Sequence, residues 1–161
     1  MGRDTVKEDF AFRSPAIGDC GLYYQWRKED AVREASFDGK TPEYSEHERW
    51  FLNKMKDPRC QMYIISVGEQ AAGQVRFENI GDRSVISISI AAGYRGKRLG
   101  SKVISFFSRL MIEEKGSRKV EAYIKKSNRA SIRAFMNSGY IFDKEVSIKG
   151  QKAVKLIYGT R

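Results

Sequence analysis

The sequence has few of the residues that build disulfide, metal and membrane-spanning structures. Its 161 residues include two cysteines, one histidine and three prolines. Cys20 and Cys60 stand far apart, with no metal-ligand spacing, so we expect no metal site and a reducing, cytoplasmic location. No apolar run reaches the roughly 18–20 residues that a membrane helix needs, and the N-terminal residues contain no apolar signal core. We therefore expect no membrane association and a single domain over residues 1–161.

Negative charge is also scarce relative to positive charge. The chain has 30 Lys and Arg residues against 20 Asp and Glu residues, which gives a net charge of +10. Such a surplus favours anionic partners, although many of these cations simply keep the surface solvated. The cations are spread along the chain and are not interleaved with aromatic residues as in RNA-binding motifs. We therefore favour an anionic small molecule over nucleic acid as the partner.

The spacing of apolar residues predicts the order of the helices and strands. In residues 84–91 three isoleucines alternate with serines, which indicates a strand, and residues 99–114 have apolar residues at helical spacing. The whole order predicts an α+β fold, an α/β/α sandwich whose mixed, mostly antiparallel sheet has about seven strands and about four flanking helices. The predicted strands are 10–14, 61–67, 74–79, 84–91, 119–125, 140–148 and 151–158, and the predicted helices are 18–35, 45–56, 99–114 and 128–138.

A short loop, RGKRLGS at residues 95–101, joins the third central strand to the long helix. The first turn of a helix leaves amide N–H groups unpaired and carries the positive end of the helix dipole. Gly96 and Gly100 allow the backbone to approach a ligand closely. The loop is neither a dinucleotide fingerprint nor a Walker loop, so it is either a pyrophosphate site or an ordinary surface loop.

A second motif favours the pyrophosphate reading. Residues 128–140, NRASIRAFMNSGY, contain an Asn, a small residue three positions later, an Ala-Phe pair and a Gly-Tyr pair. The loop follows the pattern Gln/Arg-x-x-Gly-x-Gly/Ala at Arg95 and Gly100. Together with the loop, this stretch resembles the GCN5-related N-acetyltransferase (GNAT) superfamily. The resemblance covers roughly residues 60–145, and it implies acetyl-CoA as the donor bound by residues 84–140.

The resemblance implies a set of cofactor-binding residues. The pyrophosphate would lie on the loop, the pantetheine arm would pair with the end of the preceding strand, and Asn128 would lie beside that arm. One loop residue, Arg98, stands where the family usually has Gly, and it requires either a strained positive φ or a helical first turn. We predict the helical turn, from which Arg98 would reach the phosphates. The implied residues are Ile88, Ile90, Ala91, Arg95, Gly96, Lys97, Arg98, Leu99, Gly100, Ser101, Asn128, Ser131 and Phe135.

The helices predicted within residues 18–56 precede the donor-binding half and would hold the acceptor. Their sequence resembles the W-R-x-x-x-x-V-R and E-H-x-x-W-F pattern of a GNAT subgroup that acetylates UDP-linked 4-amino-4,6-dideoxy sugars. This implies a nucleotide-sugar acceptor, which is anionic and suits the positive net charge. The implied acceptor-binding residues are Arg27, Arg33, Glu46, His47 and Trp50.

Other readings of these residues stay open. Trp50 and His47 equally suit packing positions, and the two arginines equally suit a solvated surface. Other acceptors are a protein N-terminus or another small amine, and a domain that binds acetyl-CoA without reacting is a further alternative. A homodimer is possible, although no residue pattern indicates one.

The proton route departs from the family pattern. The resemblance implies direct attack of the amine on the thioester, with a tyrosine seven residues after the Asn as general acid. Phe135 stands at that position and Tyr123 replaces a Glu that the sugar-acetylating relatives carry. We expect substrate positioning to dominate, with Tyr123, His47 and Glu121 as the catalytic candidates that move protons through water.

Overall fold

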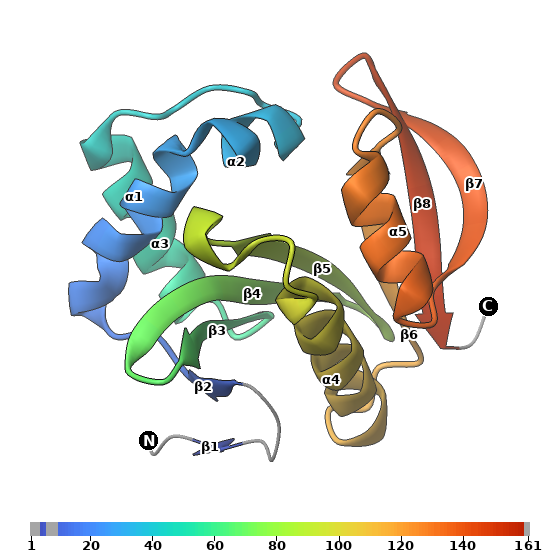
Figure 1. The fold of residues 1–161 in the computed structure, drawn as a ribbon, viewed down its shortest axis with the longest axis horizontal. Coiled ribbons are helices and arrows are strands. Elements are labelled where there is room, and N and C mark those ends of the chain that lie inside the picture. Colours follow the sequence, from blue (N-terminus) through green and yellow to red (C-terminus); the bar gives the residue numbers. More distant parts are fainter. Residues whose placement is uncertain (1–3, 6–9, 160–161) are drawn as a thin grey trace.

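The computed structural model describes residues 4–5 and 10–159 as one twisted mixed sheet with helices on both faces (Figure 1). The sheet has eight strands in the order β1-β2-β3-β4-β5-β6-β8-β7. Seven of them are the predicted strands, and the two-residue β1 adds an edge. The strands are β1 (Asp4–Thr5), β2 (Ala11–Arg13), β3 (Cys60–Val67), β4 (Gln70–Ile80), β5 (Arg83–Ile90), β6 (Lys119–Lys125), β7 (Ile141–Ile148) and β8 (Gln151–Gly159).

Five α-helices and two short 3-10 turns cover the sheet in the described part of the chain. Figure 1 shows α4 and α5 in front of the sheet, with α1, α2 and α3 grouped at upper left, above β3 and β4. The pairs are all antiparallel except β5 with β6. The helices are η1 (Ile17–Asp19), α1 (Cys20–Lys28), α2 (Asp30–Ala35), α3 (Tyr44–Lys56), η2 (Ala92–Tyr94), α4 (Leu99–Glu113) and α5 (Arg129–Asn137).

Alternation along the strands divides the apolar residues between two cores. On one face, residues such as Ile65, Val75 and Val120 pack against α4 and α5. On the other face, Met62 and Ile64 pack against α1 and α3. Each face of the sheet thus has its own set of helices.

The strands β5 and β6 separate along most of their length. Their parallel register covers only three pairs, from Arg83↔Lys119 to Val85↔Glu121. Beyond Val85, β5 pairs only with β4, whereas β6 stays paired with β8. This divergence opens the sheet between the end of β5 and the end of β6, and the loop 95–101 begins at the open side.

The first predicted helix differs from the observed structure. Residues 18–35 form η1, α1 and α2 instead of one helix, because Glu29 adopts an extended conformation (φ −63°, ψ 137°) between α1 and α2. The Glu29 carbonyl accepts bonds from the N–H groups of Val32 and Arg33, so it starts the second helix. No glycine or proline marks this break in the sequence. The break directs α2 towards β6 and β8.

Candidate active site

The loop between β5 and α4, which we call the donor loop (residues 92–98), has two residues in the left-handed conformation. Gly96 has a φ of 75° and Arg98 has a φ of 64° with a ψ of 9°. The α4 helix then begins at Leu99, and its first intrahelical bond runs from the N–H of Lys102 to the carbonyl of Arg98. The Arg98 side chain does not cap the helix. The amides of residues 99–101 therefore have no intrahelical acceptor and are suited to an anion.

The prediction that Arg98 begins the helix is wrong. Arg98 is the N-cap residue and is left-handed, which costs an L-residue roughly 1–2 kcal/mol. The glycine that the family usually has here would avoid this cost. Of the two predicted conformations of Arg98, the positive φ is the one that the turn from β5 into α4 adopts.

The free edge of β5 offers alternate backbone groups to a ligand. The N–H of Ala91 donates to the carbonyl of Ala72 at 2.7 Å, so Ala91 faces β4 and not the opening. In an antiparallel ladder neighbouring residues face opposite strands, so Ile88 and Ile90 turn their N–H and C=O groups towards the opening. The structure thus contradicts the assignment of the Ala91 amide to the cofactor and is compatible with Ile88 and Ile90.

The start of α5 borders the same opening. Asn128 is the N-cap of α5, and its side chain accepts a 3.3 Å bond from the N–H of Ser131. The side-chain oxygen of Asn128 is therefore engaged in capping, and its NH2 group faces no described partner. Phe135 is 3% exposed and packs edge-to-face on Tyr140 with a centroid separation of 4.9 Å. As a core residue, Phe135 has no exposed surface for the cofactor contact that the sequence predicted.

Polar side chains line the sheet on the face turned to α1–α3. The strand register sets Gln74 beside Ser89 and Arg76 beside Ser87, and the side-chain bonds are 3.0 Å and 3.3 Å. On β6 the same face carries Tyr123, whose hydroxyl donates to Glu121 at 3.2 Å. These residues lie on both sides of the opening, so a molecule entering from this face meets hydroxyl, amide and guanidinium groups.

Glu121 lies at the closed end of the opening, next to the last paired residues. It is fully buried and forms ion pairs with Lys155 at 3.0 Å, Arg83 at 3.2 Å and Lys119 at 3.4 Å. Burial alone would raise its pKa, but the hydrogen bond from Lys155 and the charges of Lys155 and Arg83 together lower it. A carboxylate held ionised in this way is a poor base, which contradicts a proton-accepting role for Glu121.

The pKa of Tyr123 shifts in the opposite direction to that of Glu121. Partial burial, followed by the negative charge of Glu121, raises its pKa above that of an exposed tyrosine. The hydroxyl therefore keeps its proton at neutral pH. Tyr123 is suited to donate a proton or a hydrogen bond and unsuited to act as a base.

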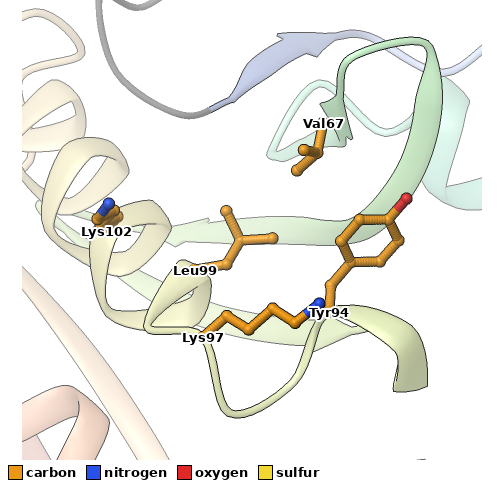
Figure 2. A pocket seen from close by; sticks show the side chains of 5 residues that line it. All are labelled: Val67, Tyr94, Lys97, Leu99 and Lys102. Carbon is orange, nitrogen blue, oxygen red and sulfur yellow. The ribbon is translucent and has the colours of Figure 1, made fainter.

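A pocket of about 230 Å³ adjoins the donor loop on the side of β3. Figure 2 shows Tyr94, Lys97 and Leu99 around it, with Val67 opposite and Lys102 on the next turn of α4. The walls are mostly apolar, and two lysines add positive charge close to the first turn of α4. The pocket therefore has positive charge beside the donor loop.

The profile of the acetyltransferase (GNAT) domain matches residues 9–141, which is most of the chain. The chain belongs to the GNAT acetyltransferase family. Membership confirms the predicted enzyme class, an acetyl-CoA-dependent N-acetyltransferase. No curated protein sequence matches significantly.

Solved structures of GNAT enzymes share the fold. Spermidine N-acetyltransferase from Vibrio cholerae, in complex with CoA and spermine, has a TM-score of 0.83 at 13% identity, covering 93% of this chain and 95% of that chain. The aminoglycoside acetyltransferase AAC(6')-Ib, in complex with ribostamycin and coenzyme A, has a TM-score of 0.83 at 18% identity, covering 96% and 94%. At these identities the likeness concerns the fold, and it confirms the predicted α+β sheet with helices on both faces.

Within this GNAT fold, the predicted donor residues fall into two groups. Backbone groups of Gly96, Lys97, Gly100 and Ser101 surround the first turn of α4. Two side chains make contacts within the protein instead. Leu99 is 6% exposed and packs in the core, and Arg95 forms an ion pair with Glu29 at 3.1 Å. This loop therefore offers a ligand mainly backbone groups.

His47, predicted as an acceptor-binding and catalytic residue, lies in the core between α1 and α3. It is 4% exposed, and its ring lies 5.1 Å from Tyr24 and 5.6 Å from Trp50. Burial lowers the pKa of His47 despite a hydrogen bond to the backbone of Cys20, so the ring is neutral. No described contact joins His47 to Tyr123 or Glu121. The ring packs within this aromatic cluster, which leaves it almost no surface for a substrate.

The other predicted acceptor residues do not lie together. Glu46 is exposed in the first turn of α3, and Trp50 stacks on the Arg76 guanidinium 5.1 Å from its ring centroid. Arg27 and Arg33 are partly buried near the junction of α1 and α2. The Arg27 Nη1 and Arg33 Nε atoms are buried without a hydrogen-bond partner, although Arg33 also pairs with Asp30. Each of these two arginines therefore has an N–H group without a hydrogen-bond partner. No described contact joins Glu46 to them.

Sequence reasoning missed several residues that shape the site. Gln74, Arg76, Ser87 and Ser89 form the polar face, and alternation along β4 and β5 was sufficient to find them. Arg83, Lys155 and Glu29 became visible only in the fold. Their partners come from strands or helices dozens of residues away, and no motif marks them.

Proposed function

We propose that this protein transfers an acetyl group from acetyl-CoA to the primary amine of a small molecule that also carries negative charge. The observation that supports this most directly is the opening of the sheet beyond Val85, which exposes the edge of β5 directly before the donor loop. A thin ligand arm can pair with such an edge while its charged end meets the helix N-terminus.

The residues around the opening fit acetyl-CoA. Amides of residues 99–101 and the positive end of α4 suit a pyrophosphate, and Gly96 adopts a positive φ of 75° that glycine tolerates without strain. Ile88 and Ile90 supply backbone pairing for a pantetheine arm. When bound, acetyl-CoA supplies an activated acetyl thioester, and the chain has to bring an amine to it and deliver a proton.

Tyr123 is the proton donor that we propose in place of the usual tyrosine. It is the first residue of β6 after the last β5–β6 pair, Val85 with Glu121, that lies on the sheet face turned to α1–α3. We call this face the acceptor side. The pKa of Tyr123 is raised. Glu121 orients the hydroxyl through the 3.2 Å bond. Arg83 and Lys155 leave this region with surplus positive charge, which stabilises a developing anion.

The acceptor side favours an amine that carries an anionic group. Unpartnered guanidinium atoms of Arg27 and Arg33 suit phosphate oxygens, which arginine binds with good geometry. A UDP-linked 4-amino sugar has both the amine and the phosphates.

The second candidate is a polycationic amine of the kind named for the structural relatives, spermidine or an aminoglycoside. Such an acceptor needs free carboxylates. Glu121, Glu29 and Glu78 on this side are each already paired with cations. The pairing of these three carboxylates favours the anionic acceptor, whereas the exposed Glu46 on α3 is in no described ion pair.

Coenzyme A release, followed with a free-thiol reagent, tests the proposal. The panel contains a UDP-linked 4-amino-4,6-dideoxy sugar, spermidine, kanamycin, an N-terminal peptide and a simple amine. We expect turnover with the UDP-sugar. Turnover only with spermidine or kanamycin would overturn the anionic acceptor, and acetyl-CoA binding without turnover on any amine would support a domain that binds without reacting.

Arginine variants test how the acceptor is held. Arg27→Gln should raise the KM for an anionic acceptor about 10-fold, because a charged hydrogen bond is lost. The KM for acetyl-CoA should stay unchanged. Arg109→Gln, on an exposed position of α4, is the matched control and should change neither value. An unchanged acceptor KM in Arg27→Gln would contradict the role of this arginine.

A tyrosine variant tests the proton donor. Tyr123→Phe should lower kcat about 100-fold at constant KM if the hydroxyl supplies a proton. Tyr158→Phe changes a tyrosine on the opposite face of the sheet, where it packs against Tyr140, and serves as the control. Equal kcat values for both variants and the wild type would show that positioning alone suffices.

A further inference from the structure

Glu29 connects the helices of the acceptor side to the donor loop. Its Oε1 atom accepts one bond from the N–H of Ala92 at 3.2 Å and another from Nη2 of Arg95 at 3.1 Å. Glu29 is 63 and 66 residues away from these partners. No other described ion pair joins α1–α3 to the donor loop.

The backbone of Glu29 is held from both sides. Its N–H donates to Trp26 at the end of α1, and its carbonyl accepts from Val32 and Arg33 at the start of α2. The carboxylate therefore reaches the donor loop from a fixed point. That point lies between Arg27 and Arg33, the two arginines with unused donors.

The two bonds of the carboxylate have different consequences. Ala92 is the first residue of η2, and its N-cap residue Ala91 has no side chain that can cap the turn. Glu29 supplies this missing cap from another part of the chain. The second bond neutralises Arg95, the first residue of the family's phosphate pattern, whose side chain is 35% exposed. A pyrophosphate on the donor loop competes with Glu29 for this guanidinium.

We propose that Glu29 is a positioning residue that holds the donor loop in shape, and that Arg95 exchanges between Glu29 and the pyrophosphate of the donor. This inference rests on the proposed function. Exchange weakens the hold on coenzyme A, the product that has to leave. It also makes the junction of α1 and α2 respond to whether the donor site is filled.

The two bonds predict opposite effects for two variants of the full chain. Glu29→Gln keeps an oxygen for the Ala92 N–H but removes the competing charge, so the Kd for coenzyme A should fall about 3-fold. Glu29→Ala removes the cap as well, so the Kd should rise about 5-fold. Isothermal titration calorimetry with coenzyme A alone measures both without any acceptor. Glu145→Gln removes the exposed pair with Lys126 and is the matched control, with no change in Kd.

Repeating the Glu29 substitution in an Arg95→Gln variant tests whether Arg95 exchanges between partners or Glu29 only supports the loop. In Arg95→Gln the charge effect of Glu29→Gln should disappear, because the competing guanidinium is gone. Unequal thermal stabilities with equal Kd values would indicate a purely structural pair and would overturn the inference. Equal Kd values in wild type, Glu29→Gln and Glu29→Ala would overturn it as well. A wild-type protein that binds no coenzyme A would instead overturn the proposed function.

Discussion

The proposed donor side and the proposed acceptor side of this molecule are built from different parts of the chain. The donor side consists of one continuous segment, from β5 through the donor loop to the first turn of α4, and it offers mostly backbone groups. The acceptor side combines side chains from α1, α2, β4, β6 and β8. A backbone site depends on conformation, whereas a side-chain site depends on which charges meet. Changes on the two sides should therefore have different effects.

The largest expected effect comes from the buried carboxylate on the acceptor side. Glu121→Gln leaves Arg83, Lys119 and Lys155 without their shared anion and should lower the free energy of unfolding by about 3 kcal/mol. Urea denaturation followed by circular dichroism measures this. Coenzyme A affinity of the folded protein should change little. Glu145→Gln, in the exposed pair with Lys126, should be nearly neutral, and equal losses in both variants would contradict this account.

The next effect tests backbone shape on the donor side. A Cβ at Gly73 would lie 2.5 Å from the carbonyl oxygen of Ser89 and 3.1 Å from the Cα of Ile90. Gly73→Ala should therefore shift the end of β5, lower the free energy of unfolding by about 1–3 kcal/mol and weaken coenzyme A binding. Gly18→Ala is the control, since a Cβ there meets nothing within 4 Å. Unchanged coenzyme A binding in Gly73→Ala would show that the end of β5 does not contribute to donor binding.

A smaller effect distinguishes backbone from side chain in the donor loop. Arg98→Gly should raise the free energy of unfolding by about 1 kcal/mol, because glycine tolerates the positive φ. Coenzyme A affinity should stay close to that of the wild type. Lys149→Gly, at a φ of 50° in the β7–β8 turn, should stabilise the protein similarly. A marked loss of affinity in Arg98→Gly alone would show that the Arg98 side chain contributes to donor binding.

The smallest effect concerns pH on the acceptor side. Burial lowers the pKa of His47 in the folded state, so the unfolded chain binds a proton more readily. The contribution of His47 to stability is complete above the unfolded pKa of about 6.5 and is lost as the pH falls below it. Urea denaturation at pH 7.5 and 5.5 should show a smaller difference for His47→Phe than for the wild type. Equal differences would contradict a buried neutral ring in the chain's single histidine.

Much of the fold was predictable because its signals are local. The alternation of isoleucine and serine placed β5 within one residue, and the apolar spacing of residues 99–114 placed α4. The two glycine-containing motifs identified the donor loop and α5. The break at Glu29 was not predictable, since no glycine or proline interrupts the helical pattern there.

The candidate site divides in the same way. The donor loop was found from its motif, but the conformation of Arg98 and the partner of the Ala91 amide were not. No motif describes the surroundings of the other predicted side chains, so their environments were not predictable. Glu46 is exposed, His47 is buried, and Glu121 is held ionised. Arg27 and Arg33 remain candidates because their unused donors are a property of the folded structure.

The sequence by itself determined the order of strands and helices, the division of residues between the two faces of the sheet, and the family. These follow from periodicity within single elements and from glycines at tight turns. Only the tertiary structure decided which charges meet, where the sheet opens, and which carboxylate holds the donor loop. Those properties depend on distances between residues far apart in the chain, and the pKa values and the unused hydrogen-bond donors arise from these distances.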